Sequence, residues 1–340
     1  MKASMGARTF LIAEAGVNHN GDVGLAKALV DVAAEAGADA VKFQTFTADR
    51  LVTRRAPTAE YQRRAGGGES QHAMLAALEL STAAHEALFA HCAERRIEFM
   101  SAPFDLESAH YLKRLGVRRL KVPSGELTNL PLLDAIGRLD LPVILSTGMA
   151  DLGEVETAVA TLRGAGLADL ALLQCVSNYP AAPAGMNLRV MQTYRQRFDV
   201  PVGLSDHTRG TAVAIAAVAL GADYVEKHFT VDRGLPGPDH QASLDPTELR
   251  GLVVAIREVE VALGDGVKAP VASELPIRAV ARKSLVAARD LPAGVTLGAA
   301  DIAILRPGTG LSPARLADVL GRKTARPIPA QTVLSEDMLL

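Results

Sequence analysis

Eight short apolar runs, each followed by a segment with helical periodicity, recur through the first 265 residues of this 340-residue chain. Nearly continuous apolar strands are typical of a parallel sheet that is covered on both faces. Eight strand–helix units in about 260 residues are what a closed (β/α)8 barrel requires, so we expect this fold, with an open doubly wound sheet as the alternative. The expected strands are residues 9–16, 39–46, 97–104, 118–125, 141–148, 170–177, 200–207 and 222–229.

Amphipathic segments between these runs predict helices, and many of them end near a glycine. The expected helices are residues 25–36, 83–95, 107–115, 132–139, 153–163, 211–220 and 246–263. We expect residues 1–265 to form the barrel domain and residues 266–282, which are rich in Pro and Gly and lack periodicity, to form a linker.

Residues 283–340 predict a second, small β-rich domain. Strands are expected at 283–290 and 294–297, turns follow them, and one helix is expected near 312–320. A module of this size has little core of its own, so we expect it to pack on a partner surface.

Composition excludes several classes of protein. Hydrophobic residues make up 49% of the chain, charged residues 22%, and the net charge is −2, which is typical of a folded enzyme and offers no attraction to nucleic acid. The longest apolar run, residues 211–222, is shorter than the roughly 20 residues of a membrane span, and the first 16 residues lack a secretory signal pattern. We therefore expect a cytoplasmic protein without a membrane segment, in which Cys92 and Cys175 are reduced core thiols.

Two lysines occupy the middle of expected parallel strands, where a buried ammonium group needs an anionic partner. They are Lys42 and Lys121, and the simplest alternative for Lys42 is a salt bridge to Glu14 at the end of the first strand. Ser124 and Ser146 follow nearby strands and add hydroxyl groups. Because barrel enzymes build their sites at the carboxyl ends of the strands, this set predicts a site for a phosphate or a phosphorylated carboxylate.

Two histidines end the seventh and eighth expected strands, one βα repeat apart. His207 and His228 are therefore neighbours in a barrel and predict a metal site with open positions for a substrate oxygen, although each could be a core histidine. Asp206, Glu226 and Asp239 are candidates for orienting the imidazoles or the substrate.

Other motifs are less specific. Residues 18–22, Asn-His-Asn-Gly-Asp, follow the first strand and are also compatible with ordinary turn chemistry. The glycine-rich run at 65–71 lacks the strand, helix and Lys-Ser/Thr context of a phosphate loop, so we expect a mobile lid or a flexible insertion. Four further histidines are expected on solvated faces: His72, His85, His91 and His110.

Ten motifs, in order and spread over nearly the whole chain, resemble the sialic acid synthase family. They are LIAEAGVNHNGD, AGADAVKFQTF, KVPSGELTNLPLL, VILSTGM, SNYPA, VGLSDHT, VEKHFT, PGPDHQASL, RKSLVA and RPGTG. The last two belong to a module that resembles the antifreeze-like (SAF) domain. The resemblance implies condensation of phosphoenolpyruvate with an N-acetylmannosamine-type sugar and water, giving phosphate and a nine-carbon 2-keto acid, N,N'-diacetyllegionaminate or N-acetylneuraminate.

The same resemblance implies roles for individual residues. A divalent metal, Mn²⁺ or Mg²⁺, would be held by His207 and His228. Phosphoenolpyruvate would be held by Lys42, Lys121, Ser124, Ser146 and Ser177. The sugar would contact Gln44, Tyr179, Asp239 and Arg306, and the carboxylates considered for proton transfer are Glu14, Glu126 and Glu226. Arg306 matches an arginine that the family inserts into the neighbouring subunit, which implies a domain-swapped homodimer.

Departures from the family pattern leave the acceptor sugar open. Ala102 stands where many members have Thr, and Ser177 where some have Asn. Two other functions stay open: another condensation of phosphoenolpyruvate with an aldose, giving a 3-deoxy acid, and a non-catalytic carbohydrate-binding protein of a surface coat. The first needs a further basic cluster for a sugar phosphate, and the strand ends offer none.

Overall fold

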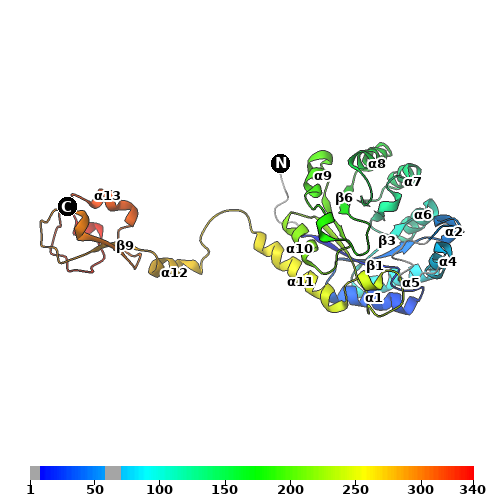
Figure 1. The fold of residues 1–340 in the computed structure, drawn as a ribbon, viewed down its shortest axis with the longest axis horizontal. Helices are drawn as coiled ribbons and strands as arrows, with labels where there is room; N and C mark the ends of the chain where they lie inside the picture. Colours follow the sequence, from blue (N-terminus) through cyan, green and yellow to red (C-terminus); the bar gives the residue numbers. More distant parts are fainter. Residues whose placement is uncertain (1–7, 58–69) are drawn as a thin grey trace. The chain divides into compact units, whose positions relative to one another are not determined.

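The computed structural model describes residues 8–57 and 70–340, which divide into two compact units, residues 1–265 and 266–340 (Figure 1). Within the described part of the first unit, eight strands form one sheet. They are β1 (Phe10–Gly16), β2 (Ala40–Thr45), β3 (Glu98–Pro103), β4 (Leu120–Val122), β5 (Val143–Ser146), β6 (Leu170–Cys175), β7 (Val202–Asp206) and β8 (Tyr224–His228).

The sheet closes into a barrel. Its strand order is β3-β2-β1-β8-β7-β6-β5-β4, and every ladder in it is parallel. The first strand pairs with the last, which an open doubly wound sheet does not allow, and β3 and β4 contact each other. The (β/α)8 barrel predicted from the sequence is thus confirmed, and the open sheet is wrong.

Helices surround this sheet (Figure 1). They are α1 (Val23–Ala36), α2 (Ala48–Leu51), α4 (Gln71–Ala77), α5 (Thr82–Arg95), α6 (Leu106–Leu115), α7 (Leu130–Gly137), α8 (Leu152–Gly164), α9 (Val190–Phe198), α10 (Ala212–Ala219) and α11 (Pro246–Leu263). None of the helices in the part of the chain that the structure describes is long and apolar enough to cross a membrane.

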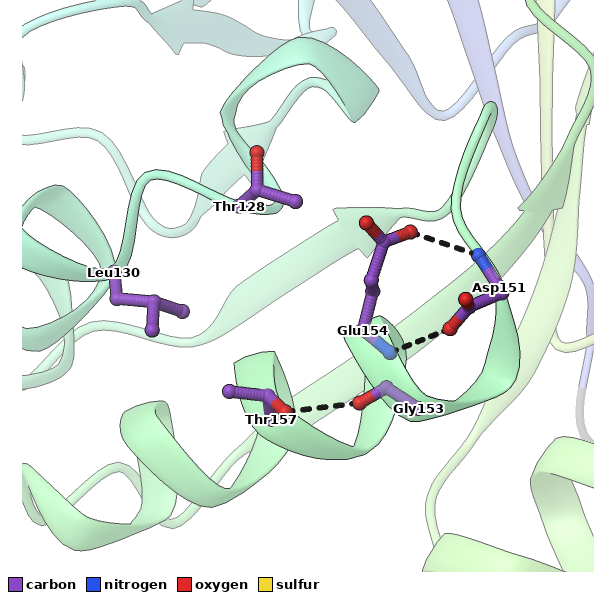
Figure 2. A pocket seen from close by; sticks show the side chains of 6 residues that line it. All are labelled: Thr128, Leu130, Asp151, Gly153, Glu154 and Thr157. Carbon is purple, nitrogen blue, oxygen red and sulfur yellow. Dashed lines mark hydrogen bonds between the residues drawn. The ribbon is translucent and has the colours of Figure 1, made fainter.

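Side-chain caps determine where these helices begin. The Asp22 carboxylate accepts a hydrogen bond from Leu25 N at 2.7 Å, and α1 ends at Gly37, whose φ is +84°. At the start of α8, Asp151 and Glu154 each accept a bond from the other's backbone N–H, both at 2.9 Å (Figure 2). Such caps satisfy amide groups that have no partner inside the helix and contribute about 1 kcal/mol each.

Side chains alternate between the two faces of each strand, which divides the apolar residues into two sets. The outward set packs against the helices and forms the main core. The inward set fills the lower half of the barrel: Ile12, Ala40, Met100, Ile144, Ala171 and Leu173. At the amino end of the strands, Arg119 pairs with Glu98 at 2.8 Å and lies 4.5 Å above the ring of Phe10. The barrel is therefore filled from below, and its polar residues face the carboxyl end.

The second unit has its own small core beside a two-stranded antiparallel sheet. It contains α12 (Glu274–Ala281), β9 (Ser284–Ala287), β10 (Ile302–Leu305) and α13 (Leu316–Val319). Residues 294–297 were expected to form a strand, but they contribute only an isolated bridge from Thr296 to Lys323, and β10 is the partner of β9.

Two further predictions for this unit are corrected. Residues 266–282 are not an irregular linker throughout, because helix α12 lies within them. Pro276 is compatible with this helix because it lies in the first turn, where a backbone N–H has no partner inside the helix. The helix expected near 312–320 is a 3₁₀ turn followed by the single turn of α13.

Candidate active site

A cavity of about 510 Å³ lies at the carboxyl ends of the barrel strands. Its lining includes twelve of the residues that the sequence nominated, all within the described part of the chain. They are Glu14, Lys42, Gln44, Lys121, Ser124, Ser146, Ser177, Tyr179, His207, Glu226, His228 and Asp239. Residues from every strand meet here because the carboxyl ends of parallel strands share one edge of the barrel.

Strand alternation explains which side chains reach the cavity. On β8, Glu226 and His228 are two residues apart and both line it, as do Ser205 and His207 at the end of β7. The intervening Lys227 does not line the cavity. Every second side chain of these strands therefore points into the barrel and lines the cavity.

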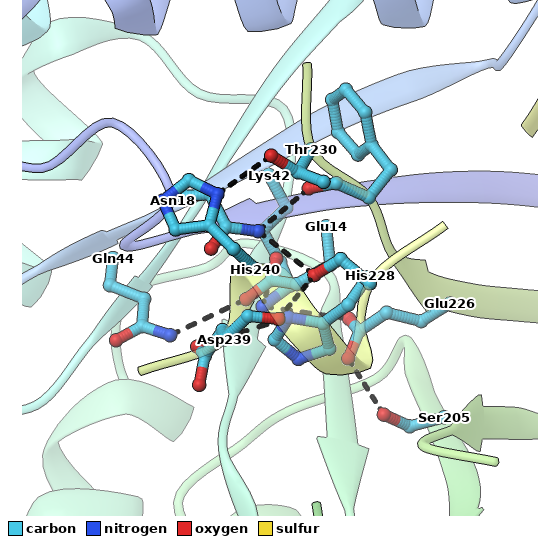
Figure 3. A network of polar contacts seen from close by, with 12 residues as sticks. Glu14, Asn18, Lys42, Gln44, Ser205, Glu226, His228, Thr230, Asp239 and His240 are labelled. Atoms are coloured by element: carbon cyan, nitrogen blue, oxygen red, sulfur yellow. Dashed lines mark hydrogen bonds and ion pairs between the residues drawn. The ribbon is translucent and has the colours of Figure 1, made fainter. Parts of the chain in front are cut away.

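Two lysines and two carboxylates form a buried group under the cavity, which we call the inner cluster: Glu14, Lys42, Lys121 and Glu226, with Ser205. Figure 3 shows Glu14, Lys42, Glu226 and Ser205 of this cluster. Lys42 Nζ lies 2.8 Å from Glu14 Oε2 and 3.6 Å from Glu226 Oε2. Lys121 Nζ lies 3.5 Å from Glu226 Oε1, which also accepts a hydrogen bond from Ser205 Oγ at 2.8 Å. The salt bridge considered for Glu14 and Lys42 therefore exists, within a larger network.

The two carboxylates of the inner cluster have very different pKa values. Burial raises the pKa of Glu14 to about 7, because the loss of hydration outweighs the attraction of Lys42. Burial also acts to raise the pKa of Glu226, but the charges of Lys121 and Lys42 outweigh it and lower that pKa to about 2. Near neutral pH, Glu226 is ionised while Glu14 can hold a proton.

Several buried polar atoms at the cavity make no hydrogen bond within the described part of the protein. Among residues 8–57 and 70–340, seven buried side-chain atoms have no hydrogen-bond partner. Besides Glu14 Oε2, which Lys42 Nζ pairs with at 2.8 Å, three of them belong to residues that line the cavity: Ser146 Oγ, Glu226 Oε2 and His228 Nδ1. Because buried polar groups are normally satisfied, this concentration is typical of a site that completes its bonds with a ligand.

Two serines converge beside Gly148. The Gly148 amide donates to Ser124 Oγ at 2.9 Å. A Cβ atom at position 148 would collide with Ser177 Oγ and lie 2.9 Å from Ser124 Oγ, so only glycine fits there. This close approach brings hydroxyl groups to the side of the cavity where Lys121 lies.

The two strand-end imidazoles lie next to each other, with ring centroids 5.3 Å apart. His207 Nδ1 is 2.7 Å from Val176 O and donates to it, so Nε2 carries the free lone pair. Burial and the neighbouring His207 hold the pKa of His228 well below its usual range, and its Nδ1 has no hydrogen-bond partner. Burial acts to lower the pKa of His207 too, but its contacts with Cys175 and Val176 O raise that pKa above its usual range. Each ring offers one nitrogen lone pair to a divalent metal, which would displace any proton held there.

No cluster of three or more potential ligands surrounds these imidazoles in the part of the chain that the structure describes. Substrate oxygens or water would therefore complete the coordination of such an ion. Asp239 lies near the pair, with Oδ2 4.0 Å from His228 Nδ1, and burial raises its pKa to about 6. The Tyr179 ring centroid is 4.2 Å from that of His207.

Two of the residues to which the family resemblance gives a role are not in the cavity lining. Glu126 belongs to a 3₁₀ turn (Ser124–Glu126), and its carboxylate accepts a bond from Asn129 Nδ2 at 2.8 Å. Arg306 belongs to the second unit, whose position relative to the barrel is not determined.

Other expectations are corrected by burial. Asp206 does not orient an imidazole, because its carboxylate pairs with Lys227 at 2.8 Å and it does not line the cavity. His85 does not lie on a solvated face; it is 2% exposed, and its Nε2 lies 3.0 Å from Thr45 Oγ1. The lid expected at 65–71 lies mostly outside the described residues.

Sequence reasoning missed Ser205 and Cys175, which also line the cavity. The signal was present in the chain, because each precedes a nominated residue by two positions, His207 and Ser177 respectively. Both cysteines are buried and unpaired, as the sequence predicted.

These features define a class of protein: a (β/α)8-barrel enzyme whose mouth combines a cationic pocket with a pair of adjacent imidazoles. Family models extend this result. The NeuB family model matches residues 29–268, and the SAF domain model matches residues 282–340.

Individual relatives agree over nearly the whole chain. It is 50% identical to the N,N'-diacetyllegionaminic acid synthase of Legionella pneumophila over 330 residues, covering 96% of this chain and 93% of that protein. Identity to the enzyme of the same name from Campylobacter jejuni is 46%, covering 93% and 95%. The crystal structure of the N-acetylneuraminic acid synthetase of Leptospira borgpetersenii superposes with a TM-score of 0.69 at 37% identity, covering 79% and 90%.

The chain belongs to the NeuB family and is a nonulosonic acid synthase. The resemblance stated from its motifs, the SAF module and the enzymatic nature of the protein are thereby confirmed.

Proposed function

We propose that this enzyme is an N,N'-diacetyllegionaminate synthase. It condenses phosphoenolpyruvate with the 6-deoxy-2,4-diacetamido relative of N-acetylmannosamine and water, releasing phosphate. The observation that carries this choice is the degree of identity: 50% and 46% to two synthases of that name, against 37% to a sialic acid synthetase.

The inner cluster supports binding of phosphoenolpyruvate. Two buried ammonium groups face only one fully ionised carboxylate, because Glu14 can be protonated near neutral pH. The cluster therefore favours an anion. We assign Lys42, Lys121 and the hydroxyl groups of Ser124, Ser146 and Ser177 to the phosphate and carboxylate of this substrate.

An unphosphorylated acceptor fits the rest of the cavity. Of the described residues, Lys42 and Lys121 are the only lysines or arginines in its lining, so no second basic cluster is left for a sugar phosphate. Gln44, Tyr179 and Asp239 line the same space and offer an amide, a phenol and a carboxyl group to the hydroxyl and amide groups of the sugar.

The proposed reaction joins the methylene carbon of phosphoenolpyruvate to the aldehyde carbon of the open-chain sugar. Water adds to the neighbouring carbon, and the tetrahedral intermediate expels phosphate by cleavage of its C–O bond. A divalent metal, Mn²⁺ or Mg²⁺, held by His207 and His228 would polarise the aldehyde oxygen as a Lewis acid.

Protons are moved by the carboxylates of the inner cluster. Glu14 has a pKa near the working pH, so its carboxyl group can donate a proton to the developing alkoxide or accept one from water. Glu226 stays ionised and holds Lys42 and Lys121 in place. Glu126, whose carboxylate bonds to Asn129 away from the cavity, is the weaker candidate for this role.

We further propose a homodimer in the cytoplasm, where phosphoenolpyruvate is made, with the SAF domain exchanged between subunits. The support is that Arg306, in the motif RPGTG, matches an arginine that the family inserts into the active site of the neighbouring subunit. Deleting residues from Lys283 onward is then expected to remove activity while the barrel stays folded. Full activity of the folded, truncated barrel would contradict the exchange.

The test of the proposed function is phosphate release from phosphoenolpyruvate with Mn²⁺, measured in parallel for N-acetylmannosamine and its 6-deoxy-2,4-diacetamido relative. We expect kcat/KM to be at least about tenfold higher for the second sugar, since hydrogen-bonding sites discriminate strongly against a missing partner. Preference for N-acetylmannosamine would make the enzyme a sialate synthase instead. Release with neither sugar would overturn the assignment.

Matched variants test the metal site. His207→Ala and His228→Ala are expected to abolish metal-dependent phosphate release and to weaken Mn²⁺ binding in a titration without substrate. His110→Ala, on helix α6 outside the cavity lining, serves as the control and should change neither. Unchanged Mn²⁺ binding in both test variants would exclude these ligands.

A further inference from the structure

The motif Asn18-His19-Asn20 at the end of β1 has no part in the chemistry described above and does not line the cavity. Its two asparagines instead bond to one segment that lies more than 200 residues away in the sequence, residues 229–243 between β8 and α11. Figure 3 shows Asn18 beside Thr230 and His240 of this segment.

Asn18 holds both ends of the segment. Its side chain is fully buried, and Nδ2 donates to Phe229 O at 2.8 Å and to Ser243 Oγ at 2.9 Å. Ser243 Oγ in turn donates to Asp239 O at 2.7 Å. A short chain of hydrogen bonds therefore runs from the end of β1 to the backbone of Asp239.

Asn20 holds the middle of the segment. Its Nδ2 donates to Pro236 O at 2.8 Å, and its Oδ1 accepts from His240 Nε2 at 3.3 Å. His240 Nδ1 lies 2.7 Å from Thr230 Oγ1, so one neutral tautomer satisfies both ring nitrogens. The contacts of Asn20 thus lie on both sides of Asp239 in the sequence.

The segment approaches Asn20 too closely for any side chain between them. A Cβ atom on Gly237, whose φ is +145°, would lie 2.7 Å from Asn20 Oδ1 and 2.7 Å from His240 Cδ2. The glycine therefore permits the two hydrogen bonds of Asn20.

What the segment brings to the cavity is Pro238 and Asp239. The Asp239 backbone is held through Ser243, and its neighbours on either side are held through Asn20. The Asp239 side chain is 12% exposed, and its carboxyl group lies 4.0 Å from His228 Nδ1. A small displacement of residues 236–240 would move this carboxyl group relative to the imidazole pair.

We propose that Asn18 and Asn20 are positioning residues that hold residues 229–243 so that Asp239 faces the cavity, and that they thereby set the affinity for the acceptor sugar. The effect on the sugar rests on the proposed function, in which Asp239 contacts the acceptor. The effect on the segment itself does not.

Asn20→Gly is the most direct test. Asn20 has a φ of +51°, a conformation that glycine adopts without strain, so the substitution removes only the side chain. Asp22→Ala is the matched control, because Asp22 belongs to the same turn but caps α1 instead of touching residues 229–243. It should lower the free energy of unfolding by about 1 kcal/mol and do nothing else.

Two measurements separate the segment from the sugar. Hydrogen exchange of the peptide covering residues 230–243, without any ligand, should become about tenfold faster in Asn20→Gly and stay unchanged in Asp22→Ala. Steady-state kinetics of the full-length enzyme should show an acceptor KM raised by about tenfold in Asn20→Gly, with the phosphoenolpyruvate KM unchanged.

Gly237→Ala changes the residue that packs against Asn20 and should also give faster exchange of residues 230–243 and a higher acceptor KM. Agreement between the two variants would show that neither result is an artefact of one substitution. Unchanged exchange in Asn20→Gly and Gly237→Ala would overturn the positioning role, whatever the kinetics. Faster exchange with an unchanged acceptor KM would overturn the link to the sugar. Failure of the proposed function would show differently, as a wild-type enzyme that turns over neither acceptor while the exchange result still stands.

Discussion

Strands β7 and β8 contribute to two groups of buried charges, which differ in the face of the barrel they occupy and in how completely their hydrogen bonds are made. The inner cluster, around Glu226, faces the cavity, whereas Asp206 and Lys227, one position further along each strand, form an outer pair between the barrel and its helices. Asp206 accepts from Lys227 Nζ at 2.8 Å and from Thr208 N at 2.9 Å, and Lys227 also donates to Thr208 O. Every charged atom of the outer pair has a partner.

The inner cluster is incomplete by comparison. Lys42 pairs with Glu14 at 2.8 Å, but Lys121 and Lys42 lie no closer than 3.5 and 3.6 Å to Glu226, and Glu226 Oε2 has no hydrogen-bond partner among the described residues. A buried charge with all its bonds made contributes to a unique fold, while one with bonds missing can bind a ligand. We therefore expect substitutions in the outer pair to reduce stability and similar substitutions in the inner cluster to reduce activity.

The largest effect is expected from Lys227→Met in the outer pair. Removing the ammonium group leaves the fully buried Asp206 carboxylate without its counter-charge, which should lower the free energy of unfolding by about 3–5 kcal/mol. Urea unfolding measures this loss. The double variant Asp206→Asn, Lys227→Met should recover a good part of it, and a double variant no more stable than Lys227→Met alone would show that the pair is not coupled.

The same substitution in the inner cluster should spare stability and remove activity. Lys121→Met deletes a cation that burial already disfavours, since desolvation lowers the pKa of Lys121. We expect kcat/KM for phosphoenolpyruvate to fall by about 10²–10³, as for the loss of one preorganised electrostatic donor, with the urea midpoint almost unchanged. A Lys121→Met enzyme that is unstable but active would reverse the assignment of the two groups.

Acid should also destabilise the protein through a histidine outside the cavity. His19 packs there against Phe43, and its Nδ1 accepts from Gly21 N at 3.0 Å, which requires a neutral ring. Burial, with smaller contributions from His85 and His240, lowers its pKa to about 4. The unfolded chain therefore binds the proton first, so stability is complete above about pH 6.5 and falls by up to about 3 kcal/mol as the pH drops to 4.

Unfolding of wild type and His19→Asn at a series of pH values measures this effect. The amide oxygen of Asn can replace Nδ1 as the acceptor, so the variant should lose stability less steeply between pH 6.5 and 4. Parallel curves for the two proteins would show that other groups cause the acid sensitivity.

The smallest effects are expected from two matched hydroxyl deletions. Thr45 Oγ1 on the outer face lies 2.7 Å from Ser101 Oγ and 3.0 Å from His85 Nε2, so Thr45→Val should cost about 1 kcal/mol of stability without changing turnover. Ser205→Ala removes the bond to Glu226 in the inner cluster and should lower kcat/KM about tenfold at constant stability. Equal losses of stability in both variants would remove the distinction between the faces.

Much of the barrel was predictable because strand alternation and strand–helix repetition are local properties of the sequence. The same alternation would have separated the two charged groups: since His207 and His228 face inward, Asp206 and Lys227 must face outward and can pair. The polar character of Asp206 at a strand end predicts a place in the site, but the two-residue period of the strand turns its side chain outward.

Other residues were beyond reach for different reasons. The burial of His85 depends on how α5 packs on β2 and β3, and the bond from Asn129 to Glu126 depends on a turn after β4. The tie between Asn18 and Phe229 joins the two ends of the barrel sequence, and nothing local indicates it. Contacts between elements, unlike the elements themselves, are set by tertiary packing.

The filled lower half of the barrel has a consequence for the order of events in catalysis. The Arg119–Glu98 pair and the apolar layer above it close one end, so every molecule enters and leaves the cavity by the other. Glu226 precedes His228 on β8, so the lysines beside Glu226 lie deeper than the imidazoles. With the proposed assignments, phosphoenolpyruvate must arrive before the sugar, and an early sugar blocks the only entrance, so excess acceptor should slow the enzyme.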